Sequence, residues 1–314
     1  MLFDSLKRGL LVGLKTTWTL GKIIFPVTII VSILQYTPVL PWVIKLISPL
    51  MKLIGLSGDA AIPLVLGNFL NLYAAIGAIL TMDLTVKEVF ILAVMLSFSH
   101  NLFIESGVAM RTGVKLWIVL VTRPGLAVVS AVVINLVWHG GGDTAKYGFI
   151  DGTAEQASGW MGIILQSLEK AGPGILQMAM IVIPLMIVIQ ILKDIKWLNK
   201  FSRTMAPITK SLGMKENTST TMAAGLLFGL AYGAGVMIQA VEEEGVSKKD
   251  ITLAFLFLMA CHAVVEDTLI FVPLGIPILP LFLIRLSVAI VLTLIVGTIW
   301  KRTGLLNRKE ATYD

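Results

Sequence analysis

Long apolar segments dominate the pattern of hydrophobic and polar positions along the chain. A membrane-spanning helix needs about 20 mostly apolar residues, because each residue adds about 1.5 Å toward a hydrocarbon layer of about 30 Å. Eight segments meet this requirement, at residues 19–37, 60–82, 88–107, 116–138, 173–192, 218–241, 251–272 and 276–300. The pattern therefore predicts an all-α polytopic membrane protein.

Two shorter stretches, 41–56 and 195–213, have apolar residues at helical spacing interrupted by scattered lysines. This pattern is typical of amphipathic helices that lie in the membrane interface with their lysines reaching toward water. We expect residues 1–14 and 159–171 to do the same. The polar, glycine-rich stretch 139–158 is not expected to be helical, and we interpret it as a linker between two halves.

The two halves of the chain repeat one another. A constant shift of 158 residues aligns five prolines and glycines, and a shift of 162 after an insertion near 242–245 aligns the rarer residues. The aligned pairs are Pro26 and Pro184, Pro49 and Pro207, Gly55 and Gly213, Gly67 and Gly225, Gly77 and Gly235, His100 and His262, Glu105 and Asp267, Arg123 and Arg285, and Trp138 and Trp300. We therefore predict a duplication, with a first repeat at 1–138, the linker at 139–158, a second repeat at 159–300 and a tail at 301–314.

The distribution of basic residues predicts the orientation of the repeats. Segment 38–58 carries two lysines, whereas its counterpart 193–217 carries six basic residues. Lys and Arg concentrate in cytoplasmic loops, so the two segments should lie on opposite sides of the membrane. Repeats of inverted topology need an odd number of crossings each, so one of the four apolar segments in each half should be re-entrant or broken. In the second half, we favour 251–272 as the broken or re-entrant segment over 218–241, which contains several regularly spaced glycines. Both termini are then cytoplasmic and the linker is extracytoplasmic.

Composition and charge exclude several classes of protein. Apolar residues make up 56% of the chain and charged residues 14%, which is atypical of a soluble enzyme. The net charge of +6 follows from cytoplasmic loops, and no basic run with exposed aromatic residues suggests nucleic-acid binding. One cysteine and three histidines exclude an internal disulfide and a His-rich metal cage. Phosphate-loop, serine-hydrolase and zinc-hydrolase motifs are absent, so we expect neither an enzyme nor a cofactor.

Ionisable and amide side chains interrupt the apolar segments. A charge at the bilayer centre costs about 2.5–3.5 kcal/mol, so such residues are candidates for function. We expect a solute- or ion-binding set with two counter-ions, consisting of His100, Glu105, His262, Glu266, Asp267, Asn68, Asn71 and Asn101 with Arg123 and Arg285. Two alternatives stay open. The acids could form static ion pairs, Glu105 with Arg123 and Asp267 with Arg285, or the arginines could reach from the interface toward water.

Helical spacing constrains how the histidines and acids can meet. On a straight helix, His262 and Glu266 share a face, whereas residues five apart, such as His100 and Glu105, differ by about 140°. Either each helix is broken between its His and its acid, or each His partners the acid of the other repeat. The second arrangement pairs His100 with Asp267 and His262 with Glu105. Both place these groups at the interface of the repeats, near the membrane midplane.

Two motifs carry a family resemblance. Ser99-His100-Asn101 with Glu105-Ser106, and Cys261-His262 with Glu266-Asp267-Thr268, follow glycine- or asparagine-bearing segments at 67–77 and 225–235. Together they resemble the nucleoside-recognition or Gate family, with one module in each half. Related modules occur in spore maturation A and B proteins, in FeoB-type iron permeases and in concentrative nucleoside transporters. The resemblance implies an inverted-repeat membrane fold and, for some members, transport.

The leading hypothesis is a secondary transporter or permease in the bacterial cytoplasmic (inner) membrane. It would move a small polar solute, with a nucleoside as one candidate, and the titratable groups suit proton coupling. The first alternative is a permease for Fe²⁺ or Mn²⁺, with the divalent metal bound by His262 and Glu266. The second is a non-transporting membrane partner of the spore-maturation type. The expected partners are the lipid bilayer and a small molecule or ion, and a homo-oligomer stays open.

Overall fold

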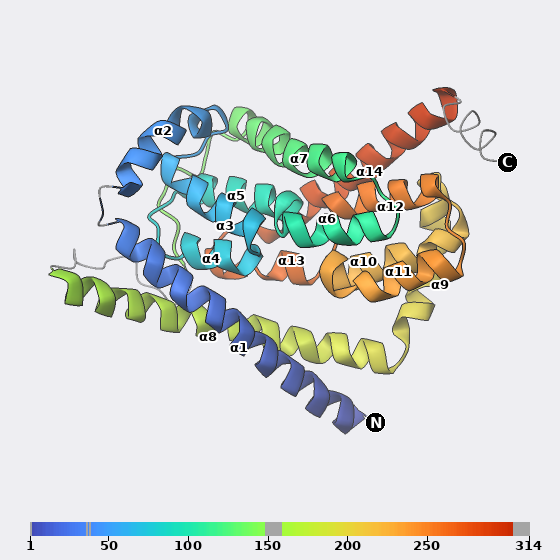
Figure 1. Cartoon of the computed structure of the whole chain (residues 1–314), viewed down its shortest axis with the longest axis horizontal. Helices are drawn as coiled ribbons and strands as arrows, with labels where there is room; N and C mark the ends of the chain where they lie inside the picture. Colours follow the sequence, from blue (N-terminus) through green and yellow to red (C-terminus); the bar gives the residue numbers. More distant parts are fainter. Residues whose placement is uncertain (1, 36, 38, 148–158, 304–314) are drawn as a thin grey trace. The chain divides into compact units, whose positions relative to one another are not determined.

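The computed structural model describes residues 2–35, 37, 39–147 and 159–303, and its regular elements are helices (Figure 1). The first repeat contains α1 (Leu2–Gln35), α2 (Val39–Leu53), η1 (Gly58–Ala60), α3 (Ala61–Phe69), α4 (Leu72–Ile79), α5 (Val86–Ser99), α6 (Leu102–Arg111) and α7 (Leu116–Val137). The second contains α8 (Gly159–Asp194), α9 (Trp197–Ser211), η2 (Glu216–Thr218), α10 (Ser219–Tyr232), α11 (Ala234–Glu243), α12 (Lys248–Ala260), α13 (Glu266–Leu269), η3 (Val272–Leu274) and α14 (Ile278–Thr303). The predicted all-α class is confirmed.

The duplication is visible in the bounds of the helices. Helices α2 and α9 are both 15 residues long and start 158 positions apart. Helices α7 and α14 start 162 positions apart, at Leu116 and Ile278. The turns after α2 and α9 contain Gly55 and Gly213 with φ of 77° and 87°, a left-handed conformation that favours glycine. Each repeat thus folds as the same module.

Helices α1 and α8 are longer than the sequence pattern indicated. Segments 1–14 and 159–171, expected to form separate interfacial helices, instead continue into the following apolar segments, giving helices of 34 and 36 residues. The two helices run side by side (Figure 1), and glycines of α1 allow the close approach. A Cβ atom on Gly9 would lie 2.6 Å from the Ile187 Cα atom, and one on Gly13 would lie 2.9 Å from the Ile183 Cα atom.

Within the described residues, four to six segments are long and apolar enough to cross a membrane. Four are single stretches, Leu2–Val31, Val86–Arg111, Leu116–Val137 and Ile278–Arg302. Two more are bent pairs, Ile44–Leu53 with Gly58–Phe69 at 92° and Met178–Asp194 with Trp197–Ser211 at 85°. Broken or re-entrant helices, as predicted, are therefore part of the fold. The opposite orientation of the repeats stays a prediction.

Several apolar segments expected to be continuous are interrupted. Gly229 inside α10 has φ 73° and ψ 178°, and residues 261–265 separate α12 from α13. Both segments considered for the break in the second repeat are thus broken. The straight helix that would place His262 and Glu266 on one face does not form, because α12 ends before His262 and Glu266 begins a new helix. Unwound backbone inside a membrane protein needs polar partners, and these partners form the site described below.

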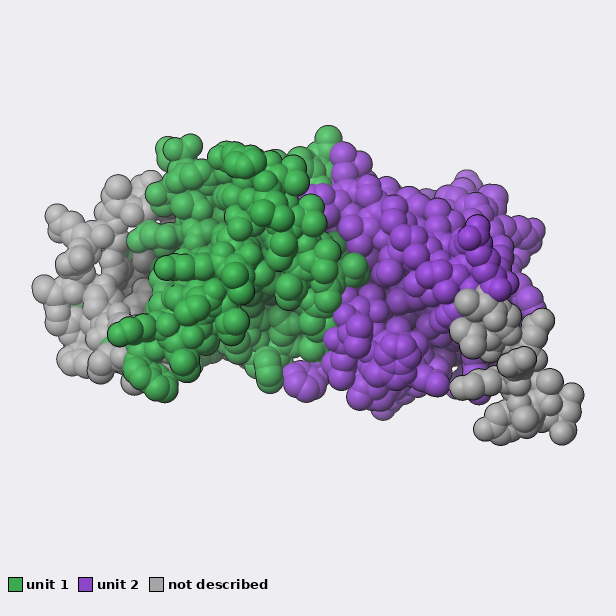
Figure 2. All heavy atoms as spheres, turned by 90° about the horizontal axis from the view of Figure 1, so that it is seen from above, with its two compact units in different colours: residues 1–102, 124–191, 266–281 green, residues 103–123, 192–265, 282–314 purple. Residues whose placement is uncertain are grey.

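The chain forms two compact units, each assembled from three separate stretches (Figure 2). Unit 1 comprises residues 1–102, 124–191 and 266–281, and unit 2 comprises 103–123, 192–265 and 282–314. Each unit therefore contains parts of both repeats.

The described part of the linker belongs to unit 1. Residues 139–147 are not helical, as predicted, and the backbone N–H of Ala145 donates to the Leu84 carbonyl oxygen at 2.8 Å. Residues 148–158 of the linker and 304–314 of the tail lie outside the described residues.

Candidate functional site

In each repeat, the equivalent position that holds a histidine lies where a helix ends or is interrupted. His100 follows the end of α5, and the next residue, Asn101, has φ 54°. The Asn101 N–H donates to the Gly67 carbonyl oxygen at 2.9 Å. In the other repeat, Ala263 has φ 40° and donates in the same way to Gly225 at 3.0 Å. The glycine-bearing segment of each repeat thus satisfies backbone groups that the broken helix releases.

Backbone contacts fix the tautomer of both histidines. The Nδ1 atom of His100 lies 2.7 Å from the Leu96 carbonyl oxygen, and that of His262 lies 2.7 Å from the Leu258 carbonyl oxygen. A carbonyl oxygen can only accept, so Nδ1 donates and carries the hydrogen in each ring. The Nε2 atom is therefore the ring nitrogen that carries no hydrogen in the neutral imidazole and can accept one.

In unit 2, four buried side chains from both repeats form one cluster. His262 Nε2 lies 3.4 Å from Glu105 Oε1, and Glu105 Oε2 lies 2.7 Å from Arg123 Nη1. Arg285 donates from Nη2 to the His262 carbonyl oxygen at 2.6 Å. Both arginines are 0% exposed, so neither reaches toward water from an interface. The cluster combines the two arrangements expected for Glu105, the pairing with the other repeat's histidine and the ion pair with Arg123.

In unit 1, the complementary pair occurs. His100 Nε2 lies 4.0 Å from Asp267 Oδ2, and both side chains are buried. The adjacent Glu266 accepts a hydrogen bond on Oε1 from the Tyr73 hydroxyl at 2.6 Å. Tyr73 was not among the site residues that the sequence pattern predicted. Its position in the apolar segment 67–77, between Asn71 and the glycine at 77, was the available signal.

The three asparagines have different roles. Asn68 donates from Nδ2 to the Leu64 carbonyl oxygen of its own helix at 2.7 Å. Asn71 caps α4 by accepting from the Ala74 N–H at 2.9 Å. The buried Oδ1 atom of Asn101 has no hydrogen-bond partner among the described residues. Asn68 and Asn71 therefore support helix structure, whereas Asn101 retains an unused acceptor.

The chemistry of the two His–acid pairs permits proton exchange or cation binding. In each pair, the Nε2 atom of a histidine faces a carboxylate, and both side chains are buried. Imidazole nitrogen and carboxylate oxygen are also ligands that suit Fe²⁺ or Mn²⁺. Glu266, expected to act as a metal ligand with His262, is engaged with Tyr73 in unit 1.

Comparison with known proteins identifies the family. Residues 17–115 and 175–277 match the Gate family model, described as nucleoside recognition, so each repeat matches once. The chain is 62% identical over 294 residues to the uncharacterized membrane protein YvoD of Bacillus subtilis (strain 168), a match that covers 94% of both chains. No solved structure matches. With both modules matched and the relative aligned over nearly its whole length, the chain belongs to the nucleoside-recognition (Gate) family of multi-pass membrane proteins.

Proposed function

We propose that this protein is a secondary transporter that moves a small polar solute across the bacterial cytoplasmic membrane. The observation that carries this proposal is the pair of buried contacts between a histidine of one repeat and an acid of the other, His262 with Glu105 and His100 with Asp267. The match to the nucleoside-recognition (Gate) family supports the same conclusion, because the family resemblance implies transport for some members.

Stability alone does not require these contacts. Replacing a buried ion pair by apolar residues is often neutral or stabilising, so charged groups retained at depth need another explanation. The Nε2 atom of each histidine faces a carboxylate beside a helix break. Protonation of that nitrogen would change the charge balance of the pair. This is how we propose that solute movement is coupled to protons.

A nucleoside is the candidate cargo that the family description suggests. Its hydroxyl and base edges need hydrogen-bonding groups in an otherwise apolar site. The Asn101 Oδ1 atom offers an acceptor, and Glu266 with Tyr73 offers a second polar group. These residues, with the two His–acid pairs, form the proposed binding set.

The test is solute uptake into proteoliposomes with an imposed pH gradient. We expect the double variant Glu105→Gln/Asp267→Asn to lose about 90% or more of uptake, since loss of one proton-transfer group typically costs about 10²-fold or more. The control variant Asp83→Asn/Glu242→Gln makes the same chemical change at exposed positions and should transport normally. Unchanged uptake in the first variant, at equal protein recovery, would refute the proposed site.

A divalent-metal permease is the second candidate, favoured by the imidazole and carboxylate of each pair. Thermal unfolding with Mn²⁺ separates the two. Stabilisation that disappears in His262→Ala but persists in His139→Ala, which changes the exposed third histidine, would support metal as the cargo. A nucleoside-dependent shift would support the leading proposal, and a stable complex with another protein but no ligand response would contradict both.

A further inference from the structure

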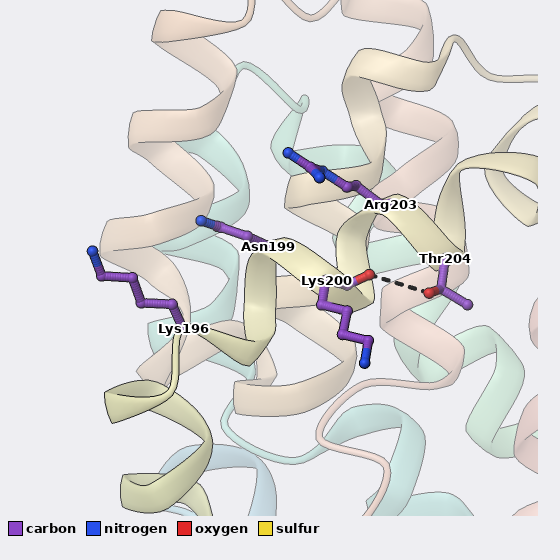
Figure 3. Close-up of a pocket in the computed structure, with 5 residues that line it drawn as sticks. All are labelled: Lys196, Asn199, Lys200, Arg203 and Thr204. Carbon is purple, nitrogen blue, oxygen red and sulfur yellow. Dashed lines mark hydrogen bonds between the residues drawn. The ribbon is translucent and has the colours of Figure 1, made fainter. Parts of the chain in front are cut away.

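A basic hollow lies along one side of α9, within unit 2 (Figure 3). It has a volume of about 570 Å³ and is lined by Lys196, Asn199, Lys200, Arg203 and Thr204. Lys196 directly precedes α9, and the other four residues recur within the helix at intervals of three and four, so these four lie on one side of it. We call these five residues the basic face of α9. Its polar groups are three cations, an amide and a hydroxyl, and no acidic residue lines it.

The cations of the basic face have no acidic partner among the residues that the structure describes. In the described part of the chain, no ion pair involves Lys196, Lys200 or Arg203. Lys210, on the same helix but outside the hollow, pairs with Glu216 at 2.7 Å. Three like charges around one hollow repel each other, and a bound anion would relieve that repulsion.

The surface beside the basic face is apolar. Trp197 and Phe201 stack with ring centroids 4.9 Å apart, and Ile208 on the same flank is 47% exposed. A third face, which includes Met205 and Thr209, is buried in unit 2. Trp197 and Phe201 are half-buried, and a partly exposed apolar and aromatic flank next to lysines and arginine is typical of a helix in the membrane interface. The anion that reaches this hollow is therefore expected to be part of a lipid.

The first repeat shows that the fold does not require these cations. At the shift of 158, the positions of the basic face correspond to Pro38, Pro41, Trp42, Lys45 and Leu46. Only Lys45 is charged, although α2 has the same length and place in its module as α9. The basic face is thus a feature added to one copy of the module.

We propose that the basic face of α9 binds the phosphate group of an anionic phospholipid. Arginine matches phosphate with two parallel hydrogen bonds, and lysine adds point charges around it. The Asn199 amide can donate to the phosphodiester, whereas the Thr204 hydroxyl donates to the Lys200 carbonyl oxygen at 3.1 Å and so offers only its oxygen to a polar headgroup (Figure 3). The acyl chains would lie against the apolar flank of Trp197, Phe201 and Ile208.

Native mass spectrometry of the detergent-purified full chain tests this binding. The probes are phosphatidylglycerol and zwitterionic phosphatidylcholine, with inorganic phosphate as a competitor. Lys200→Gln/Arg203→Gln should weaken phosphatidylglycerol binding by about tenfold or more, since each basic residue near a lipid surface contributes roughly five- to tenfold. Phosphatidylcholine binding should stay unchanged.

Two further variants keep the proposal falsifiable. Lys210→Gln removes one charge from the same helix outside the hollow and should bind phosphatidylglycerol like the unchanged protein. The charge-preserving Lys200→Arg/Arg203→Lys should retain most of the binding, which would show that a loss in the Gln variant is not misfolding. Equal loss in Lys210→Gln, full binding in Lys200→Gln/Arg203→Gln, or displacement of the lipid by millimolar phosphate would overturn the proposal of a lipid site.

Discussion

His262 Nε2 lies 3.4 Å from Glu105 Oε1, although the two residues belong to different repeats. The contact is internal to unit 2, and unit 1 holds the reciprocal contact between His100 and Asp267. Neither repeat contains both members of either pair. The duplicated module therefore completes its buried polar cluster only by exchange with its copy, which explains why both compact units draw on both repeats.

The ion pair of Glu105 and Arg123 predicts a large stability effect. Arg123→Gln should lower the free energy of unfolding by about 3–5 kcal/mol, because Glu105 would stay buried without its cation. The double variant Glu105→Gln/Arg123→Gln should recover most of this loss. Reversible unfolding in mixed micelles measures both. Arg111→Gln, at an exposed position of the neighbouring helix, should change stability by less than about 0.5 kcal/mol.

The orientation of the repeats can be read from the labelling of two equivalent positions. Lys45 of α2 and Arg203 of α9 occupy the same position of the module and are both exposed. In a Cys261→Ser background, a membrane-impermeant maleimide should label Lys45→Cys in intact cells. It should label Arg203→Cys only after the membrane is opened, because basic segments stay in the cytoplasm. Labelling of both positions from outside would show that the repeats are parallel.

Close packing of α1 on α8 predicts sensitivity at two glycines. Gly9→Ala and Gly13→Ala should each lower the free energy of unfolding by about 1–3 kcal/mol, because the new methyl group meets the backbone of α8. Gly21→Ala is the matched control on the same helix, since its nearest neighbour would be an Ile175 side-chain carbon at 3.8 Å. It should be neutral or stabilising by up to about 1 kcal/mol. Equal tolerance of all three substitutions would contradict this packing.

Tyr147 predicts a dependence of stability on alkaline pH. Burial raises the pKa of its phenol above the ordinary value of 10.0, and its hydroxyl donates to the Met82 carbonyl oxygen at 3.0 Å. The folded state thus holds the proton more tightly than the unfolded state. The resulting stability is fully present below pH 10.0 and is lost as the pH rises through the folded-state pKa.

Tyr147→Phe is the variant that isolates this effect. It should lose about 1 kcal/mol at neutral pH, because the hydrogen bond is removed. The difference in unfolding free energy between the two proteins should shrink as the pH is raised above about 10. A constant difference across this range would show that the phenol does not titrate with unfolding.

Much of the fold follows from the sequence because bilayer hydrocarbon imposes a simple rule. Backbone groups must be paired within a helix there, so apolar length alone predicted helices such as α7 and α14. The constant shift between His100 and His262 predicted one module folded twice. Apolar length alone did not locate the interruptions within 218–241 and 251–272. Apolar composition does not show that the helix is broken at Gly229 or at residues 261–265.

The sequence by itself determined which ionisable groups are buried at high cost, because His262, Glu105 and Arg123 can be recognised in it as ionisable residues within or next to apolar segments. Only the tertiary structure decided which of them meet. The four-residue spacing on a straight helix would have made Glu266 the partner of His262, but the helix is broken between them. Packing between residues far apart in the sequence brings Glu105 to His262 instead. Tyr73 was missed for the same reason, because a hydrogen bond to Glu266 across 193 positions leaves no periodic signal in the chain.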